Sequence, residues 1–188
     1  MPPLVSSTGL PGVLLVKPQR HADARGYLEE SWSERDYAQA GIATRFVQDN
    51  HSFSRVADTL RGMHCQAPPR AQDKLVRCTQ GAIFDVVVDI RQGSPSFGCW
   101  AGFELSEENG LQLFVPKGFL HGFVTLQPEV HVHYRCSDYY DPASDLAVRW
   151  DSLGIEWPLA HAPILSDRDA GAPPLAAFAS PFAFGDAV

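Results

Sequence analysis

Short runs of Val, Ile, Phe and Tyr recur along this chain, often in alternation with polar residues, and clusters of turn-forming residues separate them. Such alternation is typical of β-strands, whose successive side chains point to opposite faces of a sheet. The pattern predicts strands at residues 12–17, 44–53, 59–66, 73–79, 82–90, 99–105, 111–115, 121–126 and 130–136. Many short strands without helices between them predict an all-β sandwich or barrel.

One stretch with a different pattern, residues 33–41, predicts a short helix. Ser33 can cap its first turn, and Glu34 and Asp36 suit the positive end of the helix dipole. Gly41 can end the helix.

The length of 188 residues fits one domain with a sizeable core. We expect a single domain over residues 1–188, with its core at about 12–158. The Pro- and Ala-rich segment 159–188 is expected to pack on that core, and residues 172–188 are expected to be its most mobile part.

The net charge of −7 argues against a nucleic-acid-binding surface, but it leaves room for a small anionic ligand held by local arginines. No apolar run is long enough to cross a membrane, and the first residues lack the pattern of a signal peptide. Cys65, Cys78, Cys99 and Cys136 form no C-x-x-C pair. We expect free, buried thiols in the reducing cytoplasm.

Alternation along residues 130–136 separates two sets of side chains. Tyr134 shares a face with valines and a cysteine, which predicts that it points into the fold. His131 and His133 share the opposite, more polar face. As a His-x-His pair they are the natural candidates for a metal site, but no carboxylate at a suitable spacing completes a ligand set.

A second candidate group lies in residues 59–66, where Arg61 and His64 flank Gly62. Simple alternation would place Arg61 and His64 on opposite faces of the strand. Both side chains can reach one ligand only if Gly62 marks a β-bulge, or if Arg61 acts at the rim or on a neighbouring subunit.

Further along the chain, Lys74 shares a face with apolar residues, which suggests an inward ammonium group facing a substrate oxygen. His121 lies between glycines that allow another group to approach closely, and taken alone it reads as a buried structural histidine. Asp85 and Asp89 share one face of a strand. We interpret them as hydrogen-bonded structural acids, with paired catalytic carboxylates as the alternative.

Several blocks of sequence, taken in order, resemble the dTDP-4-dehydrorhamnose 3,5-epimerase family, cupin-like enzymes of deoxysugar biosynthesis. They include Gln-Asp-Asn-His-Ser at 48–52, Leu-Arg-Gly-Met-His at 60–64 and Gly-Phe-Leu-His-Gly-Phe at 118–123. The full set of matching stretches is 25–27 with Glu30, 46–52, 60–64, 74–77, 85–91 with 94–95, 116–123, 139–140 and 155–158. The resemblance runs from about residue 12 to 175.

The resemblance implies a jelly-roll homodimer with no metal and no organic cofactor, acting on a dTDP-linked 4-keto-6-deoxyhexose. Hydrogens on C3 and C5 of such a sugar lie next to the C4 ketone, so either can be removed to give an enolate. By resemblance, His64 is the base and Asp169 orients it. Lys74 would offset the charge on the C4 oxygen. Tyr134 would return a proton to the opposite face of the ring.

The resemblance also implies which side chains hold the sugar nucleotide. His121 would contact the sugar, Tyr140 would stack on the thymine, and arginines suit the diphosphate because their planar fork binds two oxygens. The implied substrate-binding residues are Arg25, Glu30, Gln48, Asp49, Asn50, Arg61, His121, Tyr140, Asp145 and Arg168.

Four positions depart from the usual pattern of the family. His21 and Cys65 stand where aromatic residues are expected, Asp145 replaces a glutamate and Arg168 replaces a lysine. None of these changes removes an implied catalytic group, but they bear on the exact sugar and on whether one or both carbons are inverted.

Three alternatives remain at this point. A related epimerase of another deoxysugar pathway would invert a single carbon. A metal-dependent cupin would use His64 and His121 with His131 or His133 as ligands. A non-catalytic jelly roll would only bind sugar nucleotides.

Overall fold

The computed structural model describes residues 1–185. Its strands are β1 (Leu4–Ser7), β2 (Leu14–Lys17), β3 (Arg20–Asp23), β4 (Gly26–Glu29), β5 (Gln48–Ser54), β6 (Leu60–Gln66), β7 (Lys74–Gln80), β8 (Ala82–Asp89), β9 (Trp100–Ser106), β10 (Gln112–Val115), β11 (Phe119–Thr125), β12 (Val130–Cys136) and β13 (Asp145–Ala147). The helices are α1 (Glu34–Gln39) and α2 (Asp167–Ala170), with 3-10 turns η1 (Trp150–Ser152) and η2 (Leu175–Ala177).

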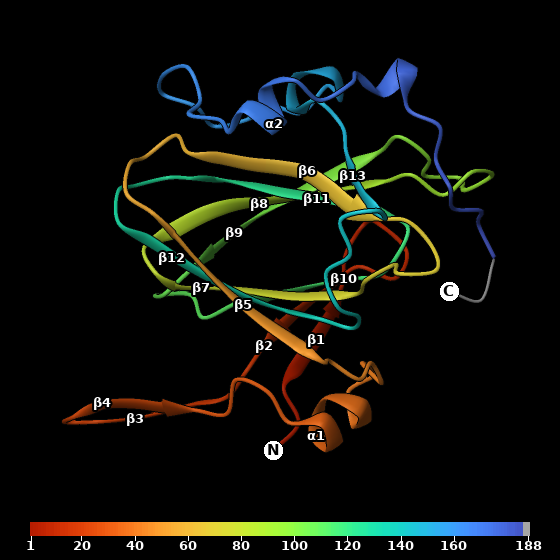
Figure 1. Ribbon diagram of the computed structural model, residues 1–188. Helices are drawn as coiled ribbons and strands as arrows, with labels where there is room; N and C mark the ends of the chain where they lie inside the picture. The colour runs from red at the N-terminus through yellow and green to blue at the C-terminus, as the bar shows by residue number, and fades with distance from the viewer. Residues whose placement is uncertain (186–188) are drawn as a thin grey trace.

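Two antiparallel sheets are stacked face to face (Figure 1). Six strands form one sheet in the order β1-β2-β10-β7-β12-β5, and five form the other in the order β13-β6-β11-β8-β9. Most neighbours in space are distant in sequence, as in a jelly roll. The predicted all-β sandwich is confirmed.

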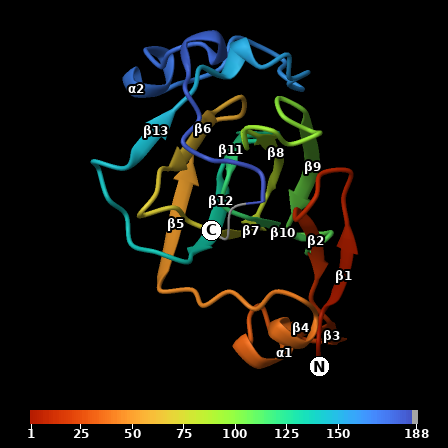
Figure 2. The same ribbon diagram turned by 90° about the vertical axis from the view of Figure 1, so that its right-hand side faces the viewer.

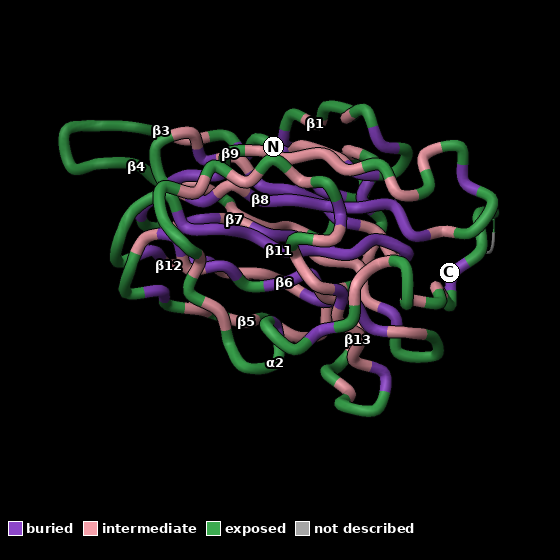
Figure 3. Tube along the Cα trace, turned by 90° about the horizontal axis from the view of Figure 1, so that it is seen from above, coloured by how far each residue is buried: buried purple, intermediate pink, exposed green. Residues whose placement is uncertain are grey.

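The five-stranded sheet is covered on both faces. Val87 and Phe119 pack towards the six-stranded sheet, whereas Val86 and Leu120 pack on the opposite side with Phe182 of the C-terminal segment. The central strands β8 and β11 are therefore buried along nearly their whole length (Figure 3). Burial on both faces explains why these strands read as almost continuous apolar runs.

The C-terminal segments form this outer cover. After β13, the chain crosses the five-stranded sheet with η1, α2 and η2 (Figure 2). It then runs along the loop after β8, where the Gln92 amide donates to the Phe182 carbonyl over 2.8 Å. The expected mobility of 172–188 stays a prediction, and its last three residues lie outside the described residues.

A two-stranded hairpin, β3–β4, projects from the body on the side of the six-stranded sheet (Figure 1). Its side chains Tyr27 and Leu28 are 55% and 74% exposed. Its base is held by an ion pair between Arg20 and Glu29 at 2.7 Å. A protruding arm with exposed apolar side chains is typical of a contact with another chain.

The strands predicted from alternation are all present, with ends that differ by a few residues. The pattern missed β1, β3, β4 and β13, which have only three or four residues each and therefore give a weak periodic signal. It also missed α2, whose four residues form a single turn. The helix after Ser33 is present, with Ser33 accepting a hydrogen bond from the Asp36 amide.

Two further expectations concern cysteines and membranes. All four cysteines are free, but Cys99 is exposed, so the expectation that all would be buried was wrong at this position. Cys99 lies between the turn at 95–98 and the start of β9, outside the strand predicted to contain it. Within residues 1–185, no helix has the length and apolar character needed to cross a membrane.

Candidate active site

A cavity of about 500 Å³ lies between the two sheets, at the end where β6 and β11 face β12 and β7. The five-stranded sheet and the segment before α2 supply most of its walls. The residues that line it are Ser52, Thr59, Leu60, Arg61, His64, Lys74, His121, Phe123, Tyr134, Ile164, Leu165, Ser166, Arg168 and Asp169.

A β-bulge in β6 brings Arg61 and His64 to this cavity. His64 pairs with His121 and Arg61 pairs with Phe123, so three residue steps on β6 face two on β11. Gly62 occupies the extra position with φ +137°, and a Cβ there would lie 2.6 Å from the Gly122 Cα. The extra residue shifts the alternation of side chains by one position, so Arg61 and His64 both reach the cavity. Of the alternatives left open by the sequence, the bulge at Gly62 is the one that the strand register shows.

The His64 imidazole is paired with a buried carboxylate. Its Nε2 lies 2.6 Å from Oδ1 of Asp169, whose other oxygen accepts a hydrogen bond from the Gly62 amide at 3.3 Å. Burial raises the pKa of Asp169, but the hydrogen bond from His64 and its charge outweigh burial, and the pKa lies below its usual value. Asp169 is therefore a carboxylate that orients and stabilises the imidazolium.

Tyr134 and Lys74 enter the cavity from the opposite sheet. They lie on the neighbouring strands β12 and β7. As predicted, Tyr134 lies on the inner face, packed against the core with Val132. Burial raises the pKa of its phenol above 10, so the hydroxyl stays protonated at neutral pH.

A second histidine–carboxylate pair lies beside the first. The Nε2 atom of His121 lies 2.8 Å from Oδ1 of Asp85, and both side chains are buried. Asp85 Oδ2 has no hydrogen-bond partner among residues 1–185. Asp85 is thus hydrogen-bonded, as predicted, but its partner is a cavity histidine. Asp89 instead accepts hydrogen bonds from Arg91, Ser94 and Ser96, so the two aspartates do not form a pair.

A second chamber of about 310 Å³ opens next to the first and shares His64, Lys74, Tyr134 and Arg168 with it. Arg168 and Asp145 form an ion pair at 2.8 Å across this chamber, and Asp145 also accepts from the Tyr140 hydroxyl at 3.1 Å. The predicted binding residues that line it are Gln48, Asn50, Tyr140, Asp145 and Arg168.

Cys65, the residue that stands for an expected aromatic, also lines the second chamber. Burial raises the pKa of its thiol to about 12, against a smaller opposing effect of Lys74. It therefore contributes a neutral, compact surface to the chamber rather than a thiolate.

Three predicted binding residues lie elsewhere. Asp49 is on the outer face of β5, paired with Arg135 at 3.3 Å, because strand alternation turns it away from Gln48 and Asn50. We therefore leave Asp49 out of the proposed site. Arg25 and Glu30 lie at the tip and at the base of the β3–β4 hairpin, and neither lines the two chambers.

The histidines of the metal alternative are not brought together. His131 and His133 lie on the outer face of β12, where both stack on His51, whereas His64 and His121 line the cavity. Among residues 1–185, no three His, Cys, Asp or Glu side chains are arranged to hold a metal ion. The described residues thus offer no ligand set for a metal-dependent cupin.

Sequence reasoning also missed contributors to the cavity wall. Phe123 and Ile164 supply apolar surface, and Ser166 accepts from the Asp169 amide at 3.1 Å and caps the turn that carries this aspartate. The Asp85–His121 pair left no local signal, because it depends on the pairing of β8 with β11. Ser166 before Asp167 and Asp169, by contrast, is a recognisable N-cap signal.

The charges around the first chamber suit an anionic ligand. Arg61, Lys74 and Arg168 line it together with a single carboxylate, Asp169, which the His64 imidazole already contacts. A base paired with a carboxylate, a protonated phenol and cations on opposite walls can remove a proton from carbon, stabilise an oxyanion and return a proton.

Comparisons with known proteins agree with this chemistry. A family model described as dTDP-4-dehydrorhamnose 3,5-epimerase matches residues 7–177. The chain belongs to this family. A Salmonella typhimurium dTDP-4-dehydrorhamnose 3,5-epimerase is 46% identical over 173 residues, which cover 90% of this chain and 94% of that protein.

Solved structures of related epimerases share the fold. One is a Legionella pneumophila dTDP-6-deoxy-D-glucose-3,5-epimerase in complex with dTDP-4-keto-L-rhamnose. It is 40% identical, with a TM-score of 0.90, and the match covers 94% of this chain and 95% of that one. Another is a Streptomyces bikiniensis 3′-monoepimerase in complex with dTDP-quinovose. It is 35% identical, with a TM-score of 0.84 and coverages of 94% and 88%.

Proposed function

We propose that this member of the 3,5-epimerase family inverts C3 and C5 of a dTDP-linked 4-keto-6-deoxyhexose, converting dTDP-4-dehydro-6-deoxyglucose to dTDP-4-dehydrorhamnose. One observation carries the proposal: His64, backed by Asp169, and Tyr134 line one cavity from opposite sheets. A sugar ring between them would meet a base on one face and an acid on the other. The relatives named as 3,5-epimerases support the double inversion.

The base in this reaction is the His64 imidazole. Its Nε2 is engaged by Asp169 at 2.6 Å, which leaves Nδ1 to accept the proton from carbon. The carboxylate then stabilises the imidazolium that forms. Asp169 itself stays ionised, since its pKa lies below the usual value. A positioned base of this kind contributes roughly 10²–10⁴ in rate.

The negative charge that develops on the C4 oxygen needs a partner. Lys74 is the cation on the opposite sheet, and His121, held by Asp85, is the donor on the same sheet as the base. One preorganised contact of this type is typically worth ~10²–10³ in rate. We assign Lys74 and His121 to this oxygen and to the adjacent sugar hydroxyl.

Reprotonation from the opposite face inverts the carbon. Tyr134 carries the proton to the enolate, because burial keeps its phenol protonated. The imidazolium then releases its proton to solvent and the phenolate takes one up, and the same pair acts at the second carbon, since C3 and C5 flank the same ketone. No step in this scheme requires a metal ion or an organic cofactor, and we propose that none is used.

The nucleotide part of the substrate would occupy the second chamber. Arg168 and Arg61 would pair with the diphosphate. Tyr140, exposed at the chamber mouth, would stack on the thymine. Gln48, Asn50 and Asp145 would hydrogen-bond the nucleoside. The Asp145–Arg168 ion pair closes the chamber, so the arginine exchanges part of this contact for the diphosphate when substrate binds.

Incubation of the protein with the 4-keto sugar nucleotide in heavy water tests the reaction. We expect deuterium at both C3 and C5 and conversion to the rhamno-configured product. Exchange at one carbon alone would show a single-site epimerase, like the 3′-monoepimerase relative. No exchange at either carbon would reject the proposal, and binding without exchange would leave a sugar-nucleotide-binding protein.

We further propose that the protein is a homodimer in which the β3–β4 hairpin completes the partner's site. Arg25 and Glu30 do not line the chambers of their own chain. The hairpin that carries them projects outward with Tyr27 and Leu28 exposed (Figure 1). An exchanged arm would bury these apolar side chains and deliver the arginine to the partner's diphosphate site.

Mixed dimers test this arrangement. Arg25→Ala is expected to raise KM strongly, and His64→Ala to abolish turnover. If the hairpin serves the partner, remixing the two variants at a substrate concentration far below the KM of Arg25→Ala should restore about a quarter of wild-type activity, since half of the dimers are mixed and each has one intact site. No recovery in mixed dimers, verified by mass, would show that each hairpin serves its own chain.

Two broader features belong to the same proposal. We propose that residues 1–188 form one domain, because the C-terminal segment packs on the core through Phe182. The four free thiols support a location in the reducing cytoplasm.

A further inference from the structure

One buried aspartate outside the cavity gathers an unusual set of contacts. Asp58 lies just before β6, is 8% exposed and has φ +57°, a conformation that few residues other than Gly, Asn and Asp adopt. Its carboxylate accepts hydrogen bonds from the backbone amides of Ala160 and His161, at 3.2 and 3.1 Å. The His161 Nδ1 atom lies 3.0 Å from the same carboxylate.

The backbone of Asp58 is tied to the same region. Its carbonyl accepts from the Ile164 amide at 2.9 Å, and its amide donates to the Thr125 carbonyl of β11 at 2.9 Å. Thr59 forms a parallel bridge with Ile164, whose carbonyl accepts from the Leu60 amide at 3.0 Å. Asp58 therefore fastens the segment 160–164 to the start of β6 with side chain and backbone together.

This segment leads directly into the catalytic pair. Ile164, Leu165 and Ser166 line the cavity, and Ser166 caps the turn of α2 that carries Asp169. Helix α2 has only four residues, so it has little stability of its own. The position of Asp169 is then set by the segment before it and by its contacts with β6.

We propose that Asp58 is a positioning residue for the His64–Asp169 pair, acting by anchoring segment 160–164. This inference rests on the roles proposed above for those two residues. The Asp58 carboxylate holds the first residues of the segment next to the start of β6. Asp169 accepts a hydrogen bond from the Gly62 amide at the bulge of the same strand. Both ends of the stretch are thus held on one strand, which sets the distance from Asp169 to the imidazole.

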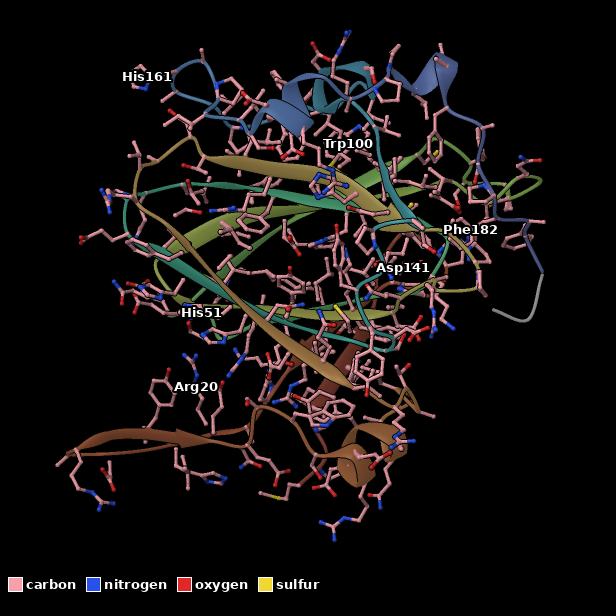
Figure 4. All side chains as sticks on the ribbon, in the orientation of Figure 1. Arg20, His51, Trp100, Asp141, His161 and Phe182 are labelled. Atoms are coloured by element: carbon pink, nitrogen blue, oxygen red, sulfur yellow. The ribbon has the colours of Figure 1, made fainter. Side chains whose placement is uncertain are left out.

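The two backbone amides carry most of this anchoring. The His161 side chain is 86% exposed, and a solvated ion pair of this kind contributes little. Figure 4 shows His161 at the outer edge of the loop that precedes α2. The pKa of Asp58 lies below its usual value, first because of the Ala160 amide and then because of the His161 imidazole. The anchor therefore stays ionised at neutral pH and does not titrate in an activity assay.

The test compares kcat, KM and the pH profile of kcat for Asp58→Ala, Asp58→Asn and His161→Ala. We expect Asp58→Ala to lower kcat by roughly 10- to 100-fold, as misplacement of a catalytic group does. The acid limb should move to lower pH, because the carboxylate no longer stabilises the charged imidazole. Asp58→Asn keeps one acceptor oxygen, so its kcat should lie between those of Asp58→Ala and wild type. The kcat of His161→Ala should stay within about threefold of the wild-type value.

Two control variants separate positioning from stability. Asp36→Ala removes a buried carboxylate of α1 that also pairs with an exposed cation, Arg35. It should lower the melting temperature without moving the pH profile. Asp169→Asn should move the acid limb in the same direction as Asp58→Ala. If Asp58→Ala does not fold, Asp58→Asn carries the test, since asparagine tolerates the same backbone conformation.

The outcomes are distinct. An unchanged kcat and acid limb in the Asp58 variants, with only a lower melting temperature, would make Asp58 a purely structural residue and overturn the inference. An effect of His161→Ala as large as that of Asp58→Ala would place the anchor in the imidazole and also overturn it. Normal turnover by Asp169→Asn would instead refute the proposed roles of the catalytic pair.

Discussion

Replacement of Tyr134 by phenylalanine separates the two half-reactions proposed for this site. The change removes one hydroxyl group and keeps the ring that packs against the core. Because the substitution removes a single hydroxyl and leaves the packing of the ring in place, the free energy of unfolding should change by less than about 1 kcal/mol. The loss of a general acid should lower the rate of epimerisation by roughly 10²–10⁴.

The diagnostic result is the fate of the label in heavy water. His64 can still remove the proton, exchange it with solvent and return deuterium to the same face. The Tyr134→Phe variant should therefore put deuterium into the substrate without inverting the carbon. His64→Ala should give neither label nor product. Proton and mass spectra of the recovered sugar nucleotide distinguish these outcomes.

A matched control is available next to the site. Tyr139 is 61% exposed and lines neither chamber, so Tyr139→Phe should label and invert the sugar at wild-type rates. Full epimerisation by Tyr134→Phe would show that another group supplies the proton. Loss of labelling together with loss of inversion would show that Tyr134 is needed for proton removal, and the assignment of base and acid would then be reversed.

Three further predictions follow from the structure. Asp169→Asn should lower kcat by roughly 10²–10⁴, because a neutral amide no longer stabilises the imidazolium that forms on His64; a kcat equal to that of the wild type would contradict this. Gly62→Ala should reduce the free energy of unfolding by roughly 2–5 kcal/mol in denaturant titrations, since its Cβ would meet the Gly122 Cα at 2.6 Å and φ is +137°. Burial by itself raises the pKa of Asp89, but hydrogen bonds from Arg91 and the nearby serines lower it by more, so that the pKa is about 2. Because this folded-state pKa lies below the unfolded value, Asp89 stabilises the fold above pH 3.8, and about 2 kcal/mol should be lost between pH 3.8 and 2. If acid lowers the free energy of unfolding of wild type and of Asp89→Asn by the same amount, that assignment is wrong.

The sequence by itself determined the fold class and most of the strands, because hydrophobic alternation is a local property that a sheet with one buried face imposes. It also placed Tyr134 and Lys74 on inner faces, and it offered a bulge at Gly62 as one way for Arg61 and His64 to share a site. Each of these inferences depends on neighbours within a few residues. The short strands of the hairpin left no such signal, and the single turn of α2 left only the N-cap pattern at Ser166.

Only the tertiary structure decided which residues meet. Asp169 reaches His64 across 105 positions of sequence, and Asp85 reaches His121 across 36, through strand pairings that no local pattern records. The structure also places Asp49 on the outer face of β5, paired with Arg135, and Arg25 at the turn of the β3–β4 hairpin. The sequence shows which chemical groups are available, but residues far apart in the chain come within contact distance only when the two sheets pack together.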